Sequence, residues 1–407
     1  MLTYSYTAFN PSTGQKVKAQ VEAEDENSAA SLIRKQGLTP IDIKSLSASN
    51  GILSFLNRIP AKDKILFSRQ LATLLGAGLP LVQALRSTSD QTQNKQLKIV
   101  INSLISNIEA GTSLSAALEK HPKVFNSIFI NLVAAGEASG TLDKSLERLA
   151  SQQEKDADIK SKIRGAFAYP VIVLFVMFLV IGFMIIKVLP AVGSLYSSLP
   201  GASLPLITKV LLDISHFGVK YWWVVIIAFV LIIVLGGRWT RTETGKSVVD
   251  AAKMRIWPVG PLFMKVYMAR FARTSSTLIS SGVPLIQVLE ITSGSLNNVH
   301  ISKSIASAIE KVKGGMALSD AIGKDPNFLP LVPNMLKIGE QSGTIEQMTE
   351  RVAEYYEREV DNEVKTISTI MEPVLMIILG IMAFIIVAAI LLPIYSLAGN
   401  SALTSAF

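Results

Sequence analysis

One stretch of sequence occurs twice in this chain and decides how the rest is organised. Phe67–Asp90 is FSRQLATLLGAGLPLVQALRSTSD, and Phe271–Gly294 is FARTSSTLISSGVPLIQVLEITSG. Aligned without gaps, the two stretches share Phe, Arg, Thr, Leu, Gly, Pro, Leu, Gln, Leu, Thr and Ser in the same order. Average composition would give roughly one or two identities in such a window. The chain therefore contains an internal duplication, and two equivalent structural units are expected.

The duplication continues downstream to the edge of an apolar stretch. Gly-Glu-Ala-Ser-Gly-Thr at 136–141 corresponds to Gly-Glu-Gln-Ser-Gly-Thr at 339–344, and Tyr169-Pro170 corresponds to Glu372-Pro373. The offset between the copies is 204 residues in the first stretch and 203 here, so one residue is lost in between. Each copy therefore leads from a soluble unit into a candidate membrane span.

Apolar residues are concentrated in a few segments. Hydrophobic residues make up 49% of the 407 residues and charged residues only 17%. Gly165–Ile186, Tyr221–Gly237 and the chain from Pro373 onward carry no charged side chain. A helix needs about 20 apolar residues to span a bilayer. The sequence therefore predicts three transmembrane helices, at 165–189, 220–237 and 369–394.

Basic residues flank the predicted spans unevenly. The net charge is +8, and on a membrane protein such an excess more often sets topology than binds nucleic acid, so no nucleic-acid partner is expected. Basic residues cluster at 155–164, 238–255 and 358–365, whereas residues 190–220, between and at the edge of the first two spans, include only the cations Lys209 and Lys220. By the positive-inside rule, the N-terminus and both large soluble regions are predicted to be cytoplasmic and the C-terminus external.

The predicted fold class is a mainly α-helical membrane protein with a small α+β module at its N-terminus. Alternation at Leu2–Phe9 and Lys16–Glu22 indicates a hairpin, and Asp25–Gln36 has the pattern of a helix. Helical periodicity interrupted at Gly and Pro then predicts a bundle of about six short helices in each copy. The expected segments are 1–50 for the α+β module, 51–164 for the first cytoplasmic bundle, 165–189 for the first span, 190–219 for an external loop, 220–237 for the second span, 238–368 for the second cytoplasmic bundle, 369–394 for the third span and 395–407 for an external tail.

Few residues suited to catalysis or metal binding are available. The chain has no cysteine and three histidines, His121, His216 and His300. This composition removes disulfides and thiolate sites and argues against a His-based zinc site. The sequence has no phosphate-binding loop, nucleophile elbow or HExxH pattern. We therefore expect no enzyme activity and no cofactor.

Two motifs are candidate interaction determinants. The repeated Gly-Glu-x-Ser-Gly-Thr turn is typical of a helix–helix connection, but Glu137 and Glu340 oppose the dipole of the helix they end and need a local or external partner. The second motif is the membrane-edge dipeptide, Tyr169-Pro170 or Glu372-Pro373. Its proline is enough to explain a helix kink without any interaction role. An interaction role is favoured only for Glu372. The candidate interaction residues are Gly136, Glu137, Gly140, Tyr169, Pro170, Gly339, Glu340, Gly343, Glu372 and Pro373.

The helices that lead into the first and third spans are rich in charge. Glu147-Arg148 and Glu154-Lys155-Asp156 lie in one, and Glu350-Arg351 and Glu357-Arg358-Glu359 lie in the other. Such runs form a solvated helix face with ion pairs four residues apart. The alternative is a docking face for a cytoplasmic partner.

In the repeated motifs described above, the chain resembles the type II secretion F family, the inner-membrane platform proteins of type II secretion and of type IV pili (GspF/PilC). The resemblance covers nearly the full length, and only the stretch Thr274-Ser275-Ser276 departs from the motif of the first copy. The segments that carry it are Tyr4–Ala8, Gly37–Pro40, Phe67–Leu74, Gly78–Leu81, the two Gly-Glu-x-Ser-Gly turns, the two membrane-edge dipeptides and Leu391–Tyr395.

The resemblance implies a non-enzymatic protein of the bacterial inner membrane, acting as an oligomer. It implies coupling of a cytoplasmic secretion or pilus ATPase to the insertion of pilin-like subunits into a growing filament. Implied partners are that ATPase, other inner-membrane platform proteins, pilins or pseudopilins, the lipid bilayer and further copies of the chain. Type II secretion and type IV pilus assembly are not separated by these motifs. Judged from the residues alone, a small oligomeric membrane transporter subunit and a membrane-anchored receptor or adaptor are the alternatives.

Overall fold

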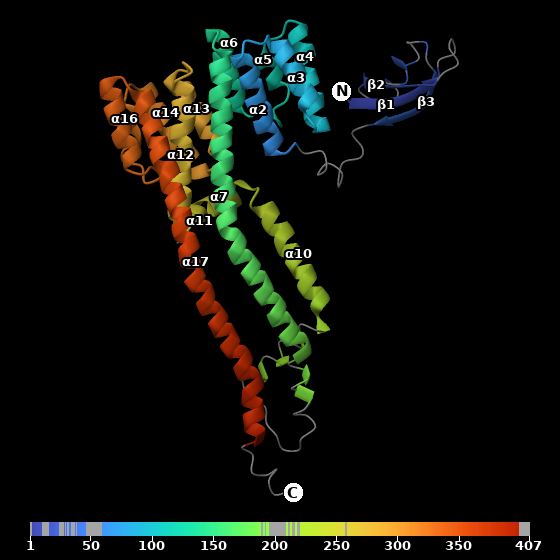
Figure 1. The fold of residues 1–407 in the computed structure, drawn as a ribbon, viewed down its shortest axis with the longest axis vertical. Helices are drawn as coiled ribbons and strands as arrows, with labels where there is room; N and C mark the ends of the chain where they lie inside the picture. The colour runs from blue at the N-terminus through green and yellow to red at the C-terminus, as the bar shows by residue number, and fades with distance from the viewer. Residues whose placement is uncertain are drawn as a thin grey trace. The chain divides into compact units, whose positions relative to one another are not determined.

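Helices dominate the described part of the chain (Figure 1). The computed structural model describes residues 2–9, 16–23, 39–45, 59–188, 220–256 and 259–398, with isolated positions between 28 and 37 and between 190 and 217. Two compact units are present. One comprises residues 1–64 and 89–102, and the other comprises residues 65–88 and 103–407.

The N-terminal residues form a three-stranded antiparallel sheet in the order β2-β1-β3. Its strands are β1 (Leu2–Phe9), β2 (Lys16–Ala23) and β3 (Thr39–Ser45). β1 pairs with β2 without interruption, whereas its register with β3 shifts between Thr7 and Ala8. The helix expected between β2 and β3 lies largely outside the described residues, so the complete α+β module stays a prediction.

The helices of the two sequence copies follow one another in the same order. The first copy contains α2 (Ala61–Gly76), α3 (Leu81–Gln91), α4 (Lys95–Glu109), α5 (Leu114–Glu119), α6 (Ser127–Ser139) and α7 (Leu142–Phe183). The second contains α12 (Val259–Ile279), α13 (Leu285–Ser295), α14 (Val299–Lys313), α15 (Leu318–Ile322), α16 (Leu331–Ser342) and α17 (Ile345–Ala398). The predicted internal repeat is therefore confirmed as a structural repeat.

The quoted motif forms the first helical hairpin of each copy. Gly78 and Gly282 have φ of 85° and 81°, which L side chains rarely adopt, and each follows the end of its helix. The proline two residues later has no N–H to leave unpaired, so it starts the next helix at little cost. This explains the shared Gly-x-Pro.

Equivalent aromatic pairs fill the cores of both copies. The rings of Phe67 and Phe125 lie 5.9 Å apart, and those of Phe271 and Phe328 lie 5.2 Å apart. All four side chains are buried. Because an aromatic pair contributes about 0.5–1.5 kcal/mol beyond its buried area, the repeated phenylalanine fixes the first helix of each copy onto the segment before α6 or α16.

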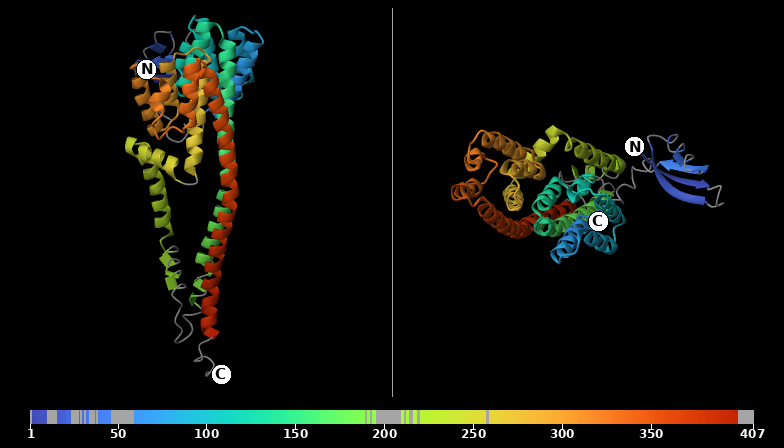
Figure 2. Two further views of the ribbon diagram at one scale, coloured as in Figure 1. Left: turned by 90° about the vertical axis from the view of Figure 1, so that its left-hand side faces the viewer. Right: turned by 90° about the horizontal axis from the view of Figure 1, so that it is seen from above.

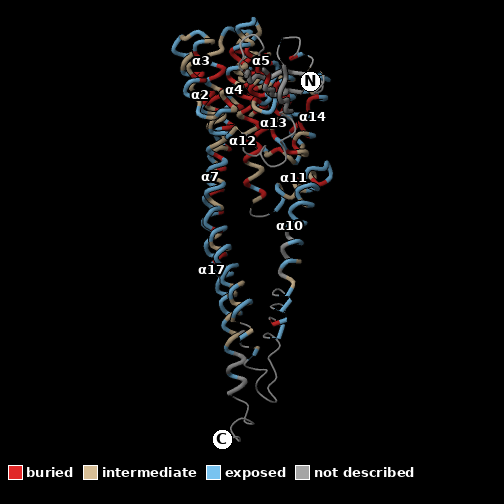
Figure 3. The backbone as a smooth tube through the Cα atoms, turned by 90° about the vertical axis from the view of Figure 1, so that its right-hand side faces the viewer, coloured by how far each residue is buried: buried red, intermediate tan, exposed pale blue. Residues whose placement is uncertain are grey.

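The long helices α7 and α17 lie side by side and connect the two copies (Figures 1 and 2). Ile159 of α7 packs in one buried cluster with Leu262 and Val266 of α12 and with Val360 and Val364 of α17. Both helices then continue into apolar sequence, where their surfaces become exposed, as Figure 3 shows by the change from red to pale blue. Burial is thus concentrated at one end of each long helix.

Two helices in the described chain are long and apolar enough to cross a membrane, and they lie in Leu142–Val188 and Ile345–Ala388. The first includes a π-helical turn at Met184–Val188 after α7. The second predicted span coincides largely with the apolar helix α10 (Trp222–Trp239). Its membrane crossing, and hence the total of three spans, stays a prediction.

Helix α11 (Glu243–Arg255), which follows α10, was not predicted from the sequence. A local signal was present, because Thr242 accepts a hydrogen bond from the N–H of Gly245 and Glu243 lies in the first turn. Both are typical of a helix N-terminus. The basic residues of this segment were interpreted only as determinants of membrane topology, and the helix was therefore not expected.

Candidate interaction site

The Gly-Glu-x-Ser-Gly-Thr turn has the same backbone geometry in both copies. Gly140 and Gly343 have φ of 69° and 72°, the left-handed conformation that ends a helix. The N–H of the following Thr141 donates to the carbonyl of Gly136 at 2.9 Å. The corresponding bond in the second copy is 2.8 Å long and ends on Gly339. The second glycine of the motif is therefore required by the backbone.

The first glycine of the motif is required by close packing. A Cβ atom on Gly136 would lie 2.7 Å from Ser145 Oγ, and one on Gly339 would lie 2.8 Å from the Cα of Ile345. Because these separations are shorter than Cβ atoms tolerate, any side chain would push the start of α7 or α17 away. This glycine thus sets how closely each short helix packs against the long helix that follows.

The glutamates of the motif bind the N-terminus of another helix. Glu137 accepts hydrogen bonds from the N–H groups of Leu114 and Ser115, at 2.5 and 3.0 Å, and from the Ser115 hydroxyl. Each carboxylate therefore satisfies unpaired N–H groups and lies at the positive end of the helix dipole of α5 or α15. The partner that the sequence analysis required is internal.

Glu340 repeats this arrangement at the start of α15. It accepts a hydrogen bond of 2.6 Å from the N–H of Leu318, one of 3.2 Å from the N–H of Ser319, and one from the Ser319 hydroxyl. The repeated glutamate is explained by this contact without an external partner.

A repeated arginine joins the first and last helices of each copy. In the first copy, Arg69 binds Glu154 with Nε to Oε1 at 2.7 Å and Nη2 to Oε2 at 2.5 Å, and it also binds Glu147. The carboxylates lie on one face of α7 because residues seven apart are two turns apart. Such two-pronged pairing fixes orientation better than a single contact.

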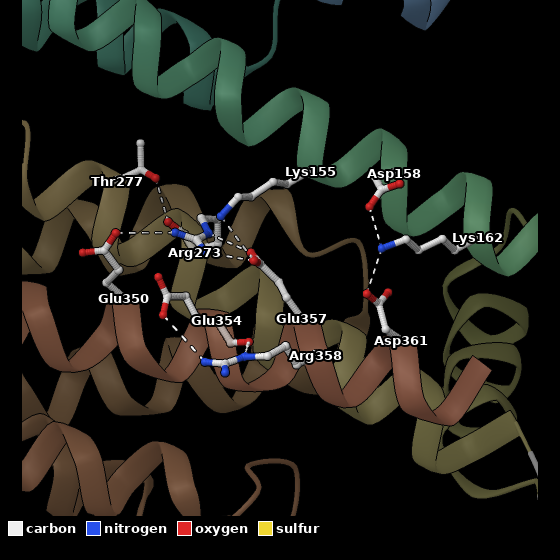
Figure 4. A network of polar contacts seen from close by, with 10 residues as sticks. All are labelled: Lys155, Asp158, Lys162, Arg273, Thr277, Glu350, Glu354, Glu357, Arg358 and Asp361. Atoms are coloured by element: carbon white, nitrogen blue, oxygen red, sulfur yellow. Dashed lines mark hydrogen bonds and ion pairs between the residues drawn. The ribbon is translucent and has the colours of Figure 1, made fainter. Parts of the chain in front are cut away.

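In the second copy, the equivalent arginine belongs to a cluster that includes a residue of the first copy. Arg273 binds Glu357 through two hydrogen bonds of 2.7 and 2.9 Å, and Glu350 lies 3.9 Å from its Nη1. Glu357 also receives Lys155 of α7 at 3.3 Å (Figure 4). The cluster therefore ties the first copy's long helix to the second copy.

Sequence reasoning missed these arginines as the partners of the repeated carboxylates. Arg69 and Arg273 are identical in the aligned motif, and Glu147, Glu154, Glu350 and Glu357 are repeated with the late offset of 203. This repetition of opposite charges was a usable signal. The arginines and the carboxylates lie about 80 residues apart in each copy, so no local pattern pairs them.

A polar groove of about 480 Å³ runs between α7 and α17. Lys162 of α7 crosses it, with Nζ 2.8 Å from Asp361 and 2.7 Å from Asp158 (Figure 4). The remaining charged lining residues are Lys155, Glu354, Glu357 and Arg358. The expected ion pairs four residues apart are present, between Lys162 and Asp158 and between Arg358 and Glu354. The alternative of a docking face for a cytoplasmic partner stays a prediction.

Ion pairing shifts the pKa values of groups in these clusters. Hydrogen bonds from Arg69 lower the pKa of the Glu154 carboxyl, with partial opposition from burial. Hydrogen bonds to Asp158 and Asp361 raise the pKa of the Lys162 ammonium. Both shifts favour the charged forms at neutral pH.

The membrane-edge dipeptides lie inside uninterrupted helices. Pro170 is buried within α7, whereas Tyr169 is exposed. Glu372 and Pro373 are both exposed on α17. Glu372 forms no hydrogen bond or ion pair with any residue that the structure describes. The ten candidate residues thus divide into three groups. Buried or half-buried are Gly136, Glu137, Gly339, Glu340 and Pro170, exposed in the turns are Gly140 and Gly343, and exposed at the membrane edge are Tyr169, Glu372 and Pro373.

Comparison with known proteins places the chain in a family. Residues 67–190 and 271–393 match the family described as "Type II secretion system (T2SS), protein F", and residues 1–44 match its N-terminal domain. The two larger matches coincide with the two sequence copies. The chain belongs to the type II secretion system protein F family.

Relatives come from both kinds of machine. A type IV pilus assembly protein PilC of Thermus thermophilus is 37% identical, with 98% of this chain and 99% of that protein covered. A PilC of Pseudomonas aeruginosa is 34% identical over 90% of this chain and 98% of its own length. A type II secretion system protein F of Pseudomonas aeruginosa is 33% identical over 98% and 99%. The expected resemblance is confirmed over nearly the whole chain.

Proposed function

We propose that this chain is an inner-membrane platform protein of a type IV pilus or type II secretion machine. In this role it passes the motion of a cytoplasmic assembly ATPase to the membrane, where pilin-like subunits enter the growing filament. It works as an oligomer with other platform proteins and has no enzymatic activity of its own. Names of relatives from both systems support the general role.

One observation carries the coupling proposal: each long helix runs without a break from a packed bundle into an apolar segment. α7 leaves the buried contacts of Leu146 and Leu149 and reaches the uncharged stretch from Gly165 onward. α17 repeats this course. Each helix stays continuous through its proline, Pro170 or Pro373, which removes only one backbone hydrogen bond, so a displacement at its bundle end is transmitted along the helix.

Contacts between the long helices make them a single mechanical element in this proposal. Lys155 and Lys162 of α7 pair with Glu357 and Asp361 of α17. The Gln152 amide of α7 also donates to Thr274 of α12, which belongs to the second bundle, at 3.0 Å in a buried contact. A movement imposed on either bundle is therefore shared by both helices. The polar groove between them, and exposed Tyr169 and Glu372 farther along, are the proposed contacts for partners.

The proposed topology puts the bundles and the spans within reach of their proposed partners. The cytoplasmic segments are the N-terminal module and both bundles, α10 is a third span, and the loop at 190–219 and the C-terminus are external. The basic clusters at 155–164 and 238–255 support this placement. The ATPase then meets the bundles, and pilins or pseudopilins meet the spans.

A flexible insertion tests the coupling directly. Gly-Gly-Ser inserted after Ser161, an exposed residue of α7 between bundle and apolar stretch, should leave membrane integration intact and abolish pilus assembly or secretion. The control is the same insertion after Gly315, which lies in an exposed turn with φ of 90°. Normal filament assembly with the Ser161 insertion would refute transmission through α7.

A further inference from the structure

A second pocket, separate from the polar groove, is strongly basic. It has a volume of about 310 Å³ and is bordered by residues of α7, α11 and α12 together with Leu296 and Asn297. Four of its lining residues are the cations Lys160, Arg164, Lys253 and Arg270, and none is acidic. Its chemistry therefore favours an anion.

The cations of the pocket are only partly neutralised by the chain itself. Lys253 pairs with Asp250 at 3.1 Å. Arg270 Nε lies 3.5 Å from Asp156, but this buried nitrogen makes no hydrogen bond with a described residue. Lys160 and Arg164 form no ion pair within 4 Å with the described part of the chain. The pocket thus holds positive charge and at least one buried donor that need an acceptor.

The pocket also has an apolar wall that continues toward the membrane. Phe167, Phe263 and Val266 line it together with the cations. Arg164 is the last charged residue before the uncharged stretch Gly165–Ile186. On the proposed topology, which this inference requires, the cations lie at the cytoplasmic surface of the bilayer and Phe167 lies just inside it.

We propose that this pocket binds the headgroup of an anionic phospholipid of the cytoplasmic leaflet. The lipid phosphate accepts hydrogen bonds from Arg164, Lys160 and Arg270, and the first acyl carbons pack on Phe167 and Phe263. Guanidinium groups are suited to phosphate through paired N–H donors. A free phosphate would use the cations but leave the aromatic wall without a ligand, so a lipid fits the whole pocket. The bound lipid would fix α7 against α12 at the point where α7 enters the membrane.

Lipid binding to the full-length protein tests the proposal. The protein is purified in a neutral detergent and titrated separately with phosphatidylglycerol, phosphatidylcholine and inorganic phosphate, with retained ligand measured by native mass spectrometry. Phosphatidylglycerol should bind in preference to phosphatidylcholine. The Lys160→Gln, Arg164→Gln double variant should bind phosphatidylglycerol about 30-fold more weakly, since each surface cation contributes about 1 kcal/mol to such binding. Both residues are exposed, so the variant should fold normally.

A matched variant separates the pocket from general charge. Arg241→Gln, Lys365→Gln removes two exposed cations near the predicted membrane surface that do not line the pocket, and it should bind phosphatidylglycerol as the unaltered protein does. Equal losses in the two double variants, equal binding of phosphatidylcholine, or competition by inorganic phosphate at the concentration of the lipid would each overturn the proposal. Resistance to carbonate extraction from membranes is measured in parallel. If the protein resists extraction but shows no preference for phosphatidylglycerol, only the lipid-binding proposal is refuted. If carbonate extracts the protein, the proposed membrane role is refuted as well.

Discussion

Arg273 binds Glu357 through two hydrogen bonds, and Arg69 binds Glu154 through the same two nitrogens in the other copy. The pairs differ in their surroundings. The Glu357 side chain is 18% exposed and also forms an ion pair with Lys155, whereas the Glu154 side chain is 43% exposed. One repeated pair thus closes its own bundle, while the other also holds the two copies together.

This difference predicts unequal effects of removing the two carboxylates. Glu357→Gln leaves two cations without their partner in a half-buried position, and we expect a loss of about 1.5–3 kcal/mol in the free energy of unfolding. Glu154→Gln should cost about 0.2–1 kcal/mol because solvent screens the exposed pair. Chemical denaturation of the full-length protein in detergent, followed by far-UV circular dichroism, measures both. Equal losses would show that Lys155 adds nothing to the cluster.

The glutamates of the repeated turn should act on stability before they act on assembly. Glu340→Gln and Glu137→Gln each remove a charge from the N-terminus of a short helix, and each should lower stability by about 1 kcal/mol. Filament assembly or secretion should then fall in proportion to the amount of folded protein. Glu119→Gln is the control, since Glu119 is exposed and forms no ion pair with a described residue. Unchanged melting with lost assembly would instead point to an external partner of the glutamates.

Alanine at the first glycine of the turn tests the close approach of the helices. Gly339→Ala places a Cβ 2.8 Å from the Cα of Ile345, so we expect a destabilisation of about 1–3 kcal/mol. Gly294→Ala is the control, because Gly294 lies in α13 with no atom within 4 Å of an added Cβ. There alanine should stabilise by about 0.5–1 kcal/mol through helix propensity. Thermal melting of both variants gives the comparison, and a neutral Gly339→Ala would contradict the tight contact.

The Lys265–Glu359 contact between α12 and α17 should make stability depend on pH. Lys265 Nζ lies 3.0 Å from Glu359 and 2.6 Å from Glu363. The hydrogen bond from Lys265 lowers the pKa of Glu359. Burial alone would lower the pKa of Lys265, but its two carboxylate partners outweigh burial and raise it.

The sign of the effect follows from linkage. A carboxyl whose pKa is lower in the folded state stabilises the fold above its unfolded value of about 4.5 and loses that effect as the pH falls through the folded pKa. A lysine with a raised pKa stabilises the fold below about 10.5 and loses that effect as the pH rises. The difference in melting temperature between the unaltered protein and Glu359→Gln should therefore be constant from about pH 5 to 9 and shrink below about pH 4. A difference that grows on acidification would exclude the assigned pairing.

Several elements could be predicted from sequence because their causes are local or repeated. Helix ends at Gly140 and Gly343 follow from the left-handed conformation that glycine accepts. The helix order followed from periodicity. The partners of Glu137 and Glu340 could not be predicted, because they depend on which short helix packs beside the turn. The basic pocket was also missed, since Arg164, Lys253 and Arg270 come from three helices whose packing no local pattern specifies.

The topology can be mapped with single cysteines because the native chain has none. Ser203→Cys and Ser401→Cys lie in the loop and tail that the positive-inside rule places outside. In intact cells with a permeabilised outer envelope they should react with a membrane-impermeant maleimide. Lys123→Cys and Lys324→Cys replace exposed lysines of the two bundles, and these should react only after the inner membrane is disrupted. Labelling of Ser203→Cys together with protection of Ser401→Cys would mean that α10 does not cross the membrane as proposed. Labelling of both bundle positions in sealed cells would reverse the orientation and remove the bundles from the reach of a cytoplasmic ATPase.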